Sequence, residues 1–97
     1  MWKLALYVAN WRPKSHAALT NLKRICYEHL EGRCQIAVID LEKSPGLAKK
    51  MEIIAIPTLV RRFPLPMRRV IGDLSNTERV LERLGMSLMI KSDFKVT

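Results

Sequence analysis

The alternation of apolar and polar positions predicts a strand and then a helix at the start of the chain. Residues 3–9 form a compact apolar run that leads to Pro13, and proline cannot continue a ladder of backbone hydrogen bonds. Apolar side chains then recur at helical spacing over residues 18–30. Ser15 is the expected N-cap of this helix and Gly32 its expected stop signal.

A second strand, a short helix and a third strand are predicted next. The run from Cys34 to Leu41 is short and rich in β-branched residues, which favours a buried parallel strand and completes a β-α-β unit. Ser44-Pro45 supplies a capping hydroxyl and a proline suited to the first helical position, ahead of a short apolar stripe over residues 47–51. Residues 56–60 indicate a strand, with Pro57 tolerated only near its start or on an edge.

The last part of the chain predicts a hairpin and a closing helix. Residues 61–66 are expected to turn, and residues 67–71 alternate enough to form the partner strand, closed by Gly72. Ser75 and Glu78 have the spacing of a capping box, in which each side chain satisfies an otherwise unpaired amide at a helix start. The helix that follows is expected to end at Gly85.

The element order is therefore β-α-β-α-β-β-α, with a parallel first half and an antiparallel second half. This is an α/β, thioredoxin-like arrangement: a mixed central sheet with flanking helices. The 97 residues form one domain, 1–97, with a core over about 3–85. In the tail, 86–97, residues 88–90 are expected to dock and the remainder to fray.

Composition indicates a folded chain and excludes several classes of protein. Hydrophobic residues make up 48% of the sequence, and the mean hydropathy is -0.01. No apolar run approaches the roughly 20 residues that span a bilayer, and Trp11-Arg12-Pro13 is no cleavage site for a signal peptide. We expect a cytoplasmic protein. The net charge of +8 favours anionic partners such as an acidic protein face, nucleotide phosphates or nucleic acid, although it serves solubility equally well.

The two cysteines argue against redox or metal chemistry. Cys26 and Cys34 lie eight positions apart, without the spacing of a redox dithiol or a zinc site. Thioredoxins keep their dithiol after the first strand, where amide dipoles lower a thiol pKa. Residues 10–15 hold no cysteine there. We expect two inert thiols, no cofactor and no enzymatic activity.

Several segments together resemble the KaiB family, over about residues 4–84. The most specific is the run from Arg68 to Asn76, and Ile56-Pro57-Thr58 matches the element in which a proline, usually cis, precedes the third thioredoxin strand. The supporting segments are Leu6-Tyr7-Val8-Ala9, Val38-Ile39-Asp40, Lys43-Ser44-Pro45-x-Leu47-Ala48 and Ile54-Ala55-x-Pro57-Thr58-Leu59.

The resemblance implies a non-enzymatic regulator of KaiC, a hexameric ATPase, in a circadian or timing system. Family members dock on that ATPase and compete with a thioredoxin-like domain of a histidine kinase. They also adopt two folds, a tetrameric ground state with a rearranged second half and a monomeric thioredoxin-like state, which requires two packings separated by a few kcal/mol. The ground-state rearrangement, and self-association to a dimer or tetramer, are therefore alternatives here.

Three departures from the family pattern affect these expectations. Arg83 stands where glycine is common inside the last helix, which favours that helix by roughly 0.5 to 1 kcal/mol. The usual acidic tail is replaced by residues 91–97. Glu52 stands where lysine is usual on the ATPase-facing surface. We therefore predict the thioredoxin-like fold.

Candidate residues fall into three sets. The basic hairpin with Arg61, Arg62, Arg68 and Arg69 is a candidate clamp for acidic groups, against the alternative of a solvated turn. The partner-binding candidates are Trp11, Arg12, Lys49, Glu52, Arg68, Arg69, Asp73 and Arg83. The residues expected to determine the fold are Pro57, Pro64, Pro66, Gly72, Ser75 and Glu78.

Two further functions stay open beside regulation of a KaiC-type ATPase. One is stress adaptation, including oxidative stress, by a thioredoxin-fold protein that no longer binds KaiC. The other is nucleic-acid binding, which only the charge suggests, because the basic residues are spread along the chain and form no recognition motif.

Overall fold

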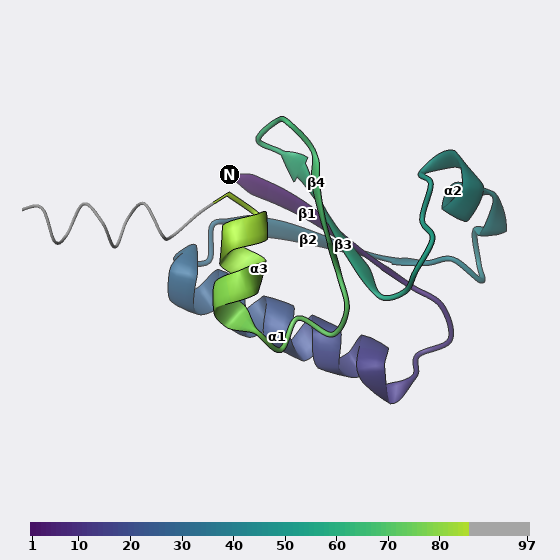
Figure 1. The fold of residues 1–97 in the computed structure, drawn as a ribbon, viewed down its shortest axis with the longest axis horizontal. Coiled ribbons are helices and arrows are strands. Elements are labelled where there is room, and N and C mark those ends of the chain that lie inside the picture. The colour runs from purple at the N-terminus through teal and green to yellow at the C-terminus, as the bar shows by residue number, and fades with distance from the viewer. Residues whose placement is uncertain (86–97) are drawn as a thin grey trace, which may run out of the picture.

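The computed structural model describes residues 1–85, which form a four-stranded mixed sheet with three helices (Figure 1). The elements in chain order are β1 (Trp2–Val8), α1 (Pro13–His29), β2 (Cys34–Asp40), α2 (Pro45–Lys50), β3 (Thr58–Phe63), β4 (Arg68–Ile71) and α3 (Thr77–Arg83). The strand order is β2-β1-β3-β4. β1 runs parallel to β2 and antiparallel to β3, and β3 runs antiparallel to β4. The predicted thioredoxin-like order is confirmed.

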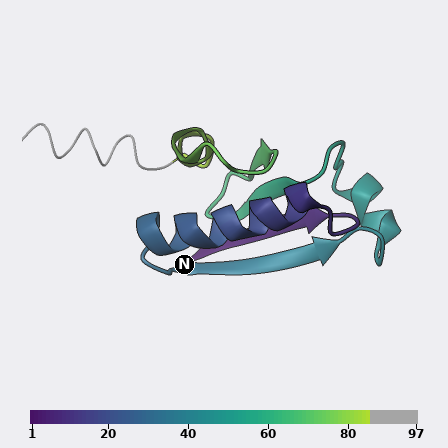
Figure 2. The ribbon, with the colours of Figure 1, turned by 90° about the horizontal axis from the view of Figure 1, so that it is seen from below.

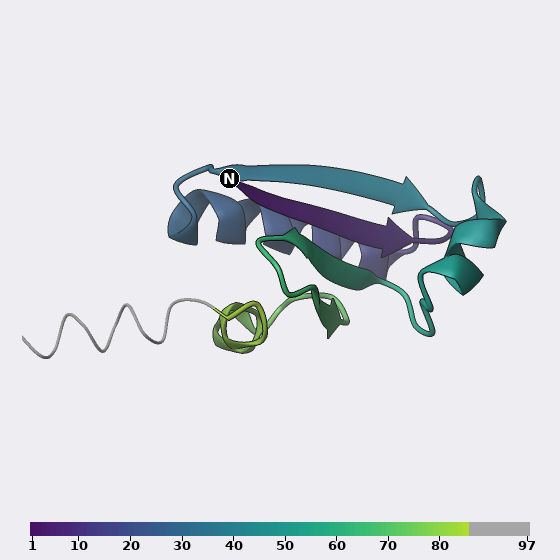
Figure 3. The same cartoon turned by 90° about the horizontal axis from the view of Figure 1, so that it is seen from above.

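The sheet separates two apolar clusters of unequal size. α1 lies along one face of the sheet, and α3 packs on the same side, beside β4 (Figure 2). The large cluster between them includes Leu6, Leu22 and Leu81. The opposite face carries a smaller cluster, in which Tyr7 and Val60 pack against residues of α2. α2 covers only one end of that face (Figure 3).

β1 is the central strand of the core. Its residues Leu4–Val8 are all buried, because their side chains alternate between the two clusters. β2, in contrast, is an edge strand, and its side chains are half-buried or exposed throughout. The prediction of a buried strand over Cys34–Leu41 was therefore wrong, since nothing pairs with the outer side of β2 in the described chain.

The two proline-led helices begin without the predicted side-chain caps. α1 starts at Pro13, with Arg12 at the N-cap, and Ser15 lies buried inside the first turn. Pro13 suits this position because the first helical amide needs no partner and its φ is already helical. α2 begins at Pro45 as predicted, but the Ser44 side chain makes no capping hydrogen bond.

α3 is capped one residue later than predicted. Asn76 is the N-cap, and its side-chain oxygen accepts a hydrogen bond from the Arg79 amide. Ser75 is instead held in a turn, where its own amide donates to Asp73 Oδ1 at 3.0 Å. The capping box of Ser75 with Glu78 was wrong in register, and Glu78 lies in the first turn of α3. The helix ends before Gly85, which has a positive φ of 80°.

β3 is longer than predicted. It continues to Phe63, so Arg61 and Arg62 belong to the strand and not to the turn. The peptide bonds before Pro57, Pro64 and Pro66 are all cis. Gly72 follows β4 with a φ of 115°, a conformation that residues with a Cβ rarely adopt.

The described part of the chain holds no helix of the length and apolar character needed to span a bilayer. The expectations for residues 86–97, including docking of residues 88–90, lie outside the described residues.

Candidate protein-docking site

Several candidate residues meet at one end of the sheet, named here the docking end. The register pairs Tyr7 with Thr58, so the loop after β1 and the loop before β3 are neighbours. The parallel pairing of Val8 with Asp40 brings the end of β2, and hence α2, to the same place. The docking end consists of Trp11, Arg12, Lys49, Glu52, Ile54 and Ile56.

Exposed apolar side chains distinguish the docking end. Trp11 is 39% exposed, Ile56 42% and Ile54 89%, although each is large enough to be a core residue. The Trp11 ring packs against His16, with ring centroids 5.0 Å apart, which holds the indole in place. Large ordered aromatic side chains of this kind are frequent anchors of protein interfaces. Ile54 was not singled out from the sequence, where it resembles any residue of an apolar run.

Charged groups border this apolar surface. Lys49 and Glu52 are exposed at the end of α2. The Arg69 guanidinium, from β4, donates to the carbonyl oxygens of Glu52 at 2.9 Å and Met51 at 2.5 Å. These carbonyls follow the end of a helix, where partial negative charge accumulates, so a cation is stabilised there. Arg69 therefore positions the α2 end, and the predicted arginine clamp for acidic partners does not form as a unit.

The thiols lie away from the docking end. Cys34 pairs with Trp2 in the register, at the opposite end of β1 from the Trp11 loop. Burial, followed by the neighbouring Cys34 thiol, raises the pKa of Cys26, and burial raises that of Cys34. Thiolates are thus disfavoured at both positions, and the thiolate is the form that performs disulfide exchange. The arrangement suits binding rather than thiol chemistry.

The other candidates lie along β4 and α3. Asp73 and Arg83 line a hollow beside Arg69, with a volume of about 470 Å³. Arg68 lies next to Arg61 near Gly85. The Ser75 hydroxyl and amide lower the pKa of the Asp73 carboxyl by hydrogen bonding to its ionised form.

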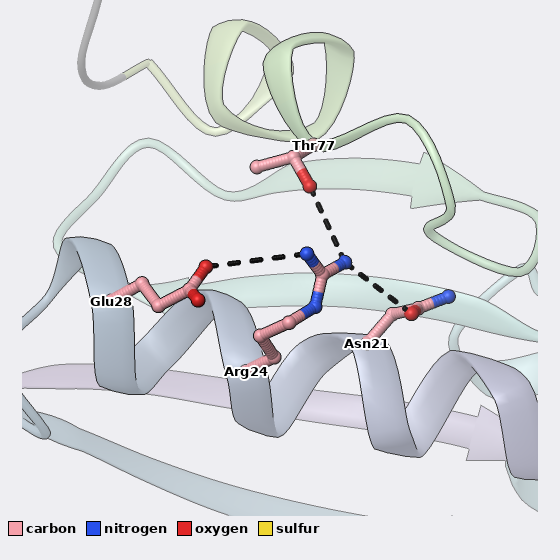
Figure 4. A network of polar contacts seen from close by, with 4 residues as sticks. All are labelled: Asn21, Arg24, Glu28 and Thr77. Atoms are coloured by element: carbon pink, nitrogen blue, oxygen red, sulfur yellow. Dashed lines mark hydrogen bonds and ion pairs between the residues drawn. The ribbon is translucent and has the colours of Figure 1, made fainter.

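Two side chains of α1 contact this second region. Asn21 Nδ2 donates to the Asp73 carbonyl oxygen at 2.8 Å. Arg24 lies between Asn21, Glu28 and Thr77, as Figure 4 shows, and makes two 3.4 Å contacts and one ion pair of 4.0 Å. The Arg24 contacts are long and exposed, so the Asn21 hydrogen bond is the stronger tie between α1 and the loop before α3.

Arg61 has a role that the sequence interpretation missed. It is only 5% exposed, and its guanidinium donates to the carbonyl oxygens of Leu84 at 2.5 Å and Pro66 at 2.7 Å. The same group lies 5.3 Å from the centre of the Trp2 ring. Arg61 thus joins β1, the hairpin turn and the end of α3. The strand alternation was the available signal, because residue 59 faces the large cluster and residue 61 shares its face.

Comparison with known proteins places the chain in a family. A family model described as the KaiB domain matches residues 5–86. The circadian clock oscillator protein KaiB of Prochlorococcus marinus is 45% identical over 95 residues, which cover 94% of this chain and 80% of the relative. The protein of the same name from Nostoc punctiforme is 48% identical over 86 residues, covering 89% and 81%.

Solved structures support the fold independently. The N-terminal domain of SasA from Synechococcus elongatus superposes with a TM-score of 0.72 at 24% identity, over 86% of this chain and 78% of that domain. Mitochondrial thioredoxin 3 of Saccharomyces cerevisiae gives 0.68 at 19% identity, over 88% and 78%. Both likenesses concern the fold alone. The domain match and the sequence relatives lead to one conclusion: this chain belongs to the KaiB family.

Proposed function

We propose that this chain is a non-enzymatic clock-type regulatory protein that acts by docking on a KaiC-type ATPase through its docking end. The observation that carries the proposal is the exposed apolar surface of Trp11, Ile54 and Ile56 where a thioredoxin would hold its dithiol. The clock-protein names of the curated relatives support the regulatory role.

The composition of the docking end favours a protein partner. Apolar side chains at its centre supply burial, which is worth roughly 25 cal/mol per Å² removed from water. Lys49 and Glu52 lie exposed beside them and supply charges of both signs, which set orientation more than affinity. A centre of apolar anchors with a polar border is the usual anatomy of a protein interface.

The fold suggests how such docking is regulated. The resemblance implies competition with a thioredoxin-like domain of a histidine kinase, and competition for one surface requires two proteins of similar shape. The N-terminal domain of SasA shares the fold of this chain. A competing domain of that shape would present equivalent loops at the end of its sheet.

The test is binding to the KaiC-type ATPase of the same organism, measured by interferometry with ATP present. Trp11→Ala and Ile54→Asp should each weaken the complex by at least about tenfold, since truncating an interface anchor costs about 2 kcal/mol. Tyr27→Ala is the matched control, because Tyr27 is 80% exposed on α1, away from the docking end.

Equal affinity of Trp11→Ala and Tyr27→Ala for the ATPase would contradict the proposal. Size-exclusion chromatography with light scattering, on the same samples, reports whether the free chain is a monomer, a dimer or a tetramer and whether the bound chain is a monomer.

A further inference from the structure

Within residues 1–85, no strand pairs with the outer side of β4. It is an edge strand of four residues, Arg68–Ile71. The Gly72 amide donates to the Pro57 carbonyl oxygen at 3.0 Å, so the inward-pointing amides recur at every second residue from Gly72. By the alternation of an antiparallel ladder, Arg69 and Ile71 direct their N–H and C=O groups away from β3. Such an edge is a template for an added strand.

A groove runs between this edge and α3. Its volume is about 470 Å³, and it is bordered by β4, by the loop that follows β4 and by one face of α3. The lining residues that the argument uses are Arg69, Ile71, Asp73, Asn76, Arg79 and Arg83. The groove and the docking end lie on different elements, because α3 borders the groove and α2 the docking end. Arg69 connects the two surfaces, since it lines the groove and its guanidinium donates to the Glu52 carbonyl oxygen.

The groove carries excess positive charge. Arg79 and Arg83 are four residues apart on α3, so they share one face of the helix, where like charges repel. Within residues 1–85, neither guanidinium forms an ion pair with a carboxylate. Among the described residues, Asp73 is the one acidic residue that lines the groove, and its carboxylate accepts a hydrogen bond from the Ser75 amide. In the described part of the chain, the Arg79 and Arg83 guanidinium groups therefore have no acidic partner in the groove.

We infer that the groove binds an acidic, extended segment of a second partner protein, which adds a strand to β4. Main-chain groups of the segment pair with Arg69 and Ile71, and its carboxylates pair with Arg79 and Arg83. Strand addition with side-chain recognition is a recurrent mode of peptide binding, and guanidinium groups bind carboxylates in bidentate pairs. The inference goes beyond docking on the ATPase, because it assigns a second surface that leaves the docking end free.

The lining favours a peptide over nucleic acid. No aromatic side chain of the described residues lines the groove, whereas single-stranded nucleic acids are bound by stacking on aromatic rings. A free strand edge offers a nucleic acid nothing specific, while a peptide backbone satisfies both the donors and the acceptors of that edge.

The experiment measures binding of a fluorescent eight-residue peptide of alternating glutamate and valine by fluorescence anisotropy. The double variant R79A/R83A should weaken binding by about tenfold or more, because two charge-assisted contacts are lost. The double variant K23A/K43A removes the same charge from exposed positions outside the groove and should change affinity by less than about twofold. Thermal unfolding verifies that each variant is folded.

Two further probes separate strand addition from attraction by charge. The same peptide with methyl groups on alternate backbone nitrogens keeps its charge but loses the N–H donors that would pair with β4. It should bind at least about tenfold more weakly. Equal losses in the two double variants, or an unchanged affinity of the methylated peptide, would overturn the inference. Tighter binding of a short single-stranded oligonucleotide, with the same dependence on Arg79 and Arg83, would also overturn it.

Discussion

The first half of the molecule, with β1 and α1, and the second half, with β4 and α3, are each stabilised by a different kind of interaction. In the first half, β1 is buried along Leu4–Val8, and α1 covers it with fully buried side chains such as Leu22 and Ile25. In the second half, apolar side chains of β4 and α3 join the same cluster, but long-range polar contacts fix where they lie. Arg61 and Arg69 each donate to two main-chain carbonyl oxygens, and Asn21 donates to a fifth.

This difference has a physical consequence. Apolar burial is spread over many side chains and tolerates small shifts, whereas a side chain that bonds to a carbonyl requires one particular geometry. A few substitutions should therefore loosen the second half while the β-α-β unit stays folded.

The largest expected effect comes from the shared core. Leu22→Ala removes a fully buried side chain of α1 and should lower the free energy of unfolding by about 3 kcal/mol, through lost burial and the cavity left behind. Urea unfolding, monitored by circular dichroism, measures this loss of free energy. Because the Leu22 cluster includes both halves, hydrogen exchange should accelerate throughout residues 1–85; a change confined to one half would contradict the comparison.

The next effect should be confined to the second half. Arg61→Ala removes both donors to Leu84 and Pro66 and leaves those oxygens unsatisfied, which should cost about 2 kcal/mol. Hydrogen exchange measured by mass spectrometry should accelerate, relative to the parent protein, more in β3, β4 and α3 than in α1.

The exposed neighbour provides the control for Arg61. Arg62→Ala removes the same charge from the same strand and should change stability by less than about 0.5 kcal/mol. Uniform acceleration of exchange across both halves in Arg61→Ala would show that Arg61 is an ordinary core residue and not a tie of the second half.

A smaller effect is expected at the α1 contact. Asn21→Ala removes the hydrogen bond to the Asp73 carbonyl oxygen and should cost about 1 kcal/mol. Asn21→Asp is the informative companion, because it keeps the size of the side chain but removes the donor, and it should be at least equally destabilised. Chemical denaturation of both variants measures the difference, and a stable Asn21→Asp would refute the role of this donor.

The smallest effect concerns pH. Hydrogen bonds from Ser75 hold the pKa of Asp73 below its ordinary value of 3.8. A carboxyl whose pKa is lowered on folding stabilises the protein above its ordinary pKa, and that contribution disappears as the pH falls through the lowered value. Asp73→Asn should therefore have a lower free energy of unfolding than the parent near pH 7 and the same free energy of unfolding in strong acid.

NMR titration of the Asp73 carboxyl carbon measures the pKa directly. The control is Glu82→Gln, which removes one negative charge from α3 without touching the turn. A midpoint at or above the ordinary value would show that the Ser75 hydrogen bonds do not favour the ionised form.

Much of the fold could be predicted from the sequence because the relevant signals are local. The element order, the hairpin and the helix end before Gly85 follow from periodicity and from the conformational preferences of glycine and proline. The absence of cysteine from residues 10–15 likewise excluded a dithiol at the loop after β1.

Tertiary structure decided which of several equivalent local choices was used. Ser75 and Asn76 are comparable N-caps by propensity, but the Asp73 side chain holds the Ser75 amide, and Asn76 caps the helix. Residues 34–41 have the composition of a buried strand, but the strand order places β2 at an edge. The first outcome combines the local hydrogen bond between Asp73 and Ser75 with the Asn21 hydrogen bond from α1, which positions Asp73. The second outcome depends on the order in which distant strands pair, which the neighbouring sequence does not encode.

The arginines show the same division most clearly. As a sequence, Arg61, Arg62, Arg68 and Arg69 are one basic cluster with a single expected role. In the structure Arg61 is buried against the end of α3, Arg69 holds the end of α2, and Arg62 and Arg68 are exposed. Composition determined that the chain is basic and folded; only the packing of β3 and β4 against the helices decided which charges are structural and which are left to meet a partner.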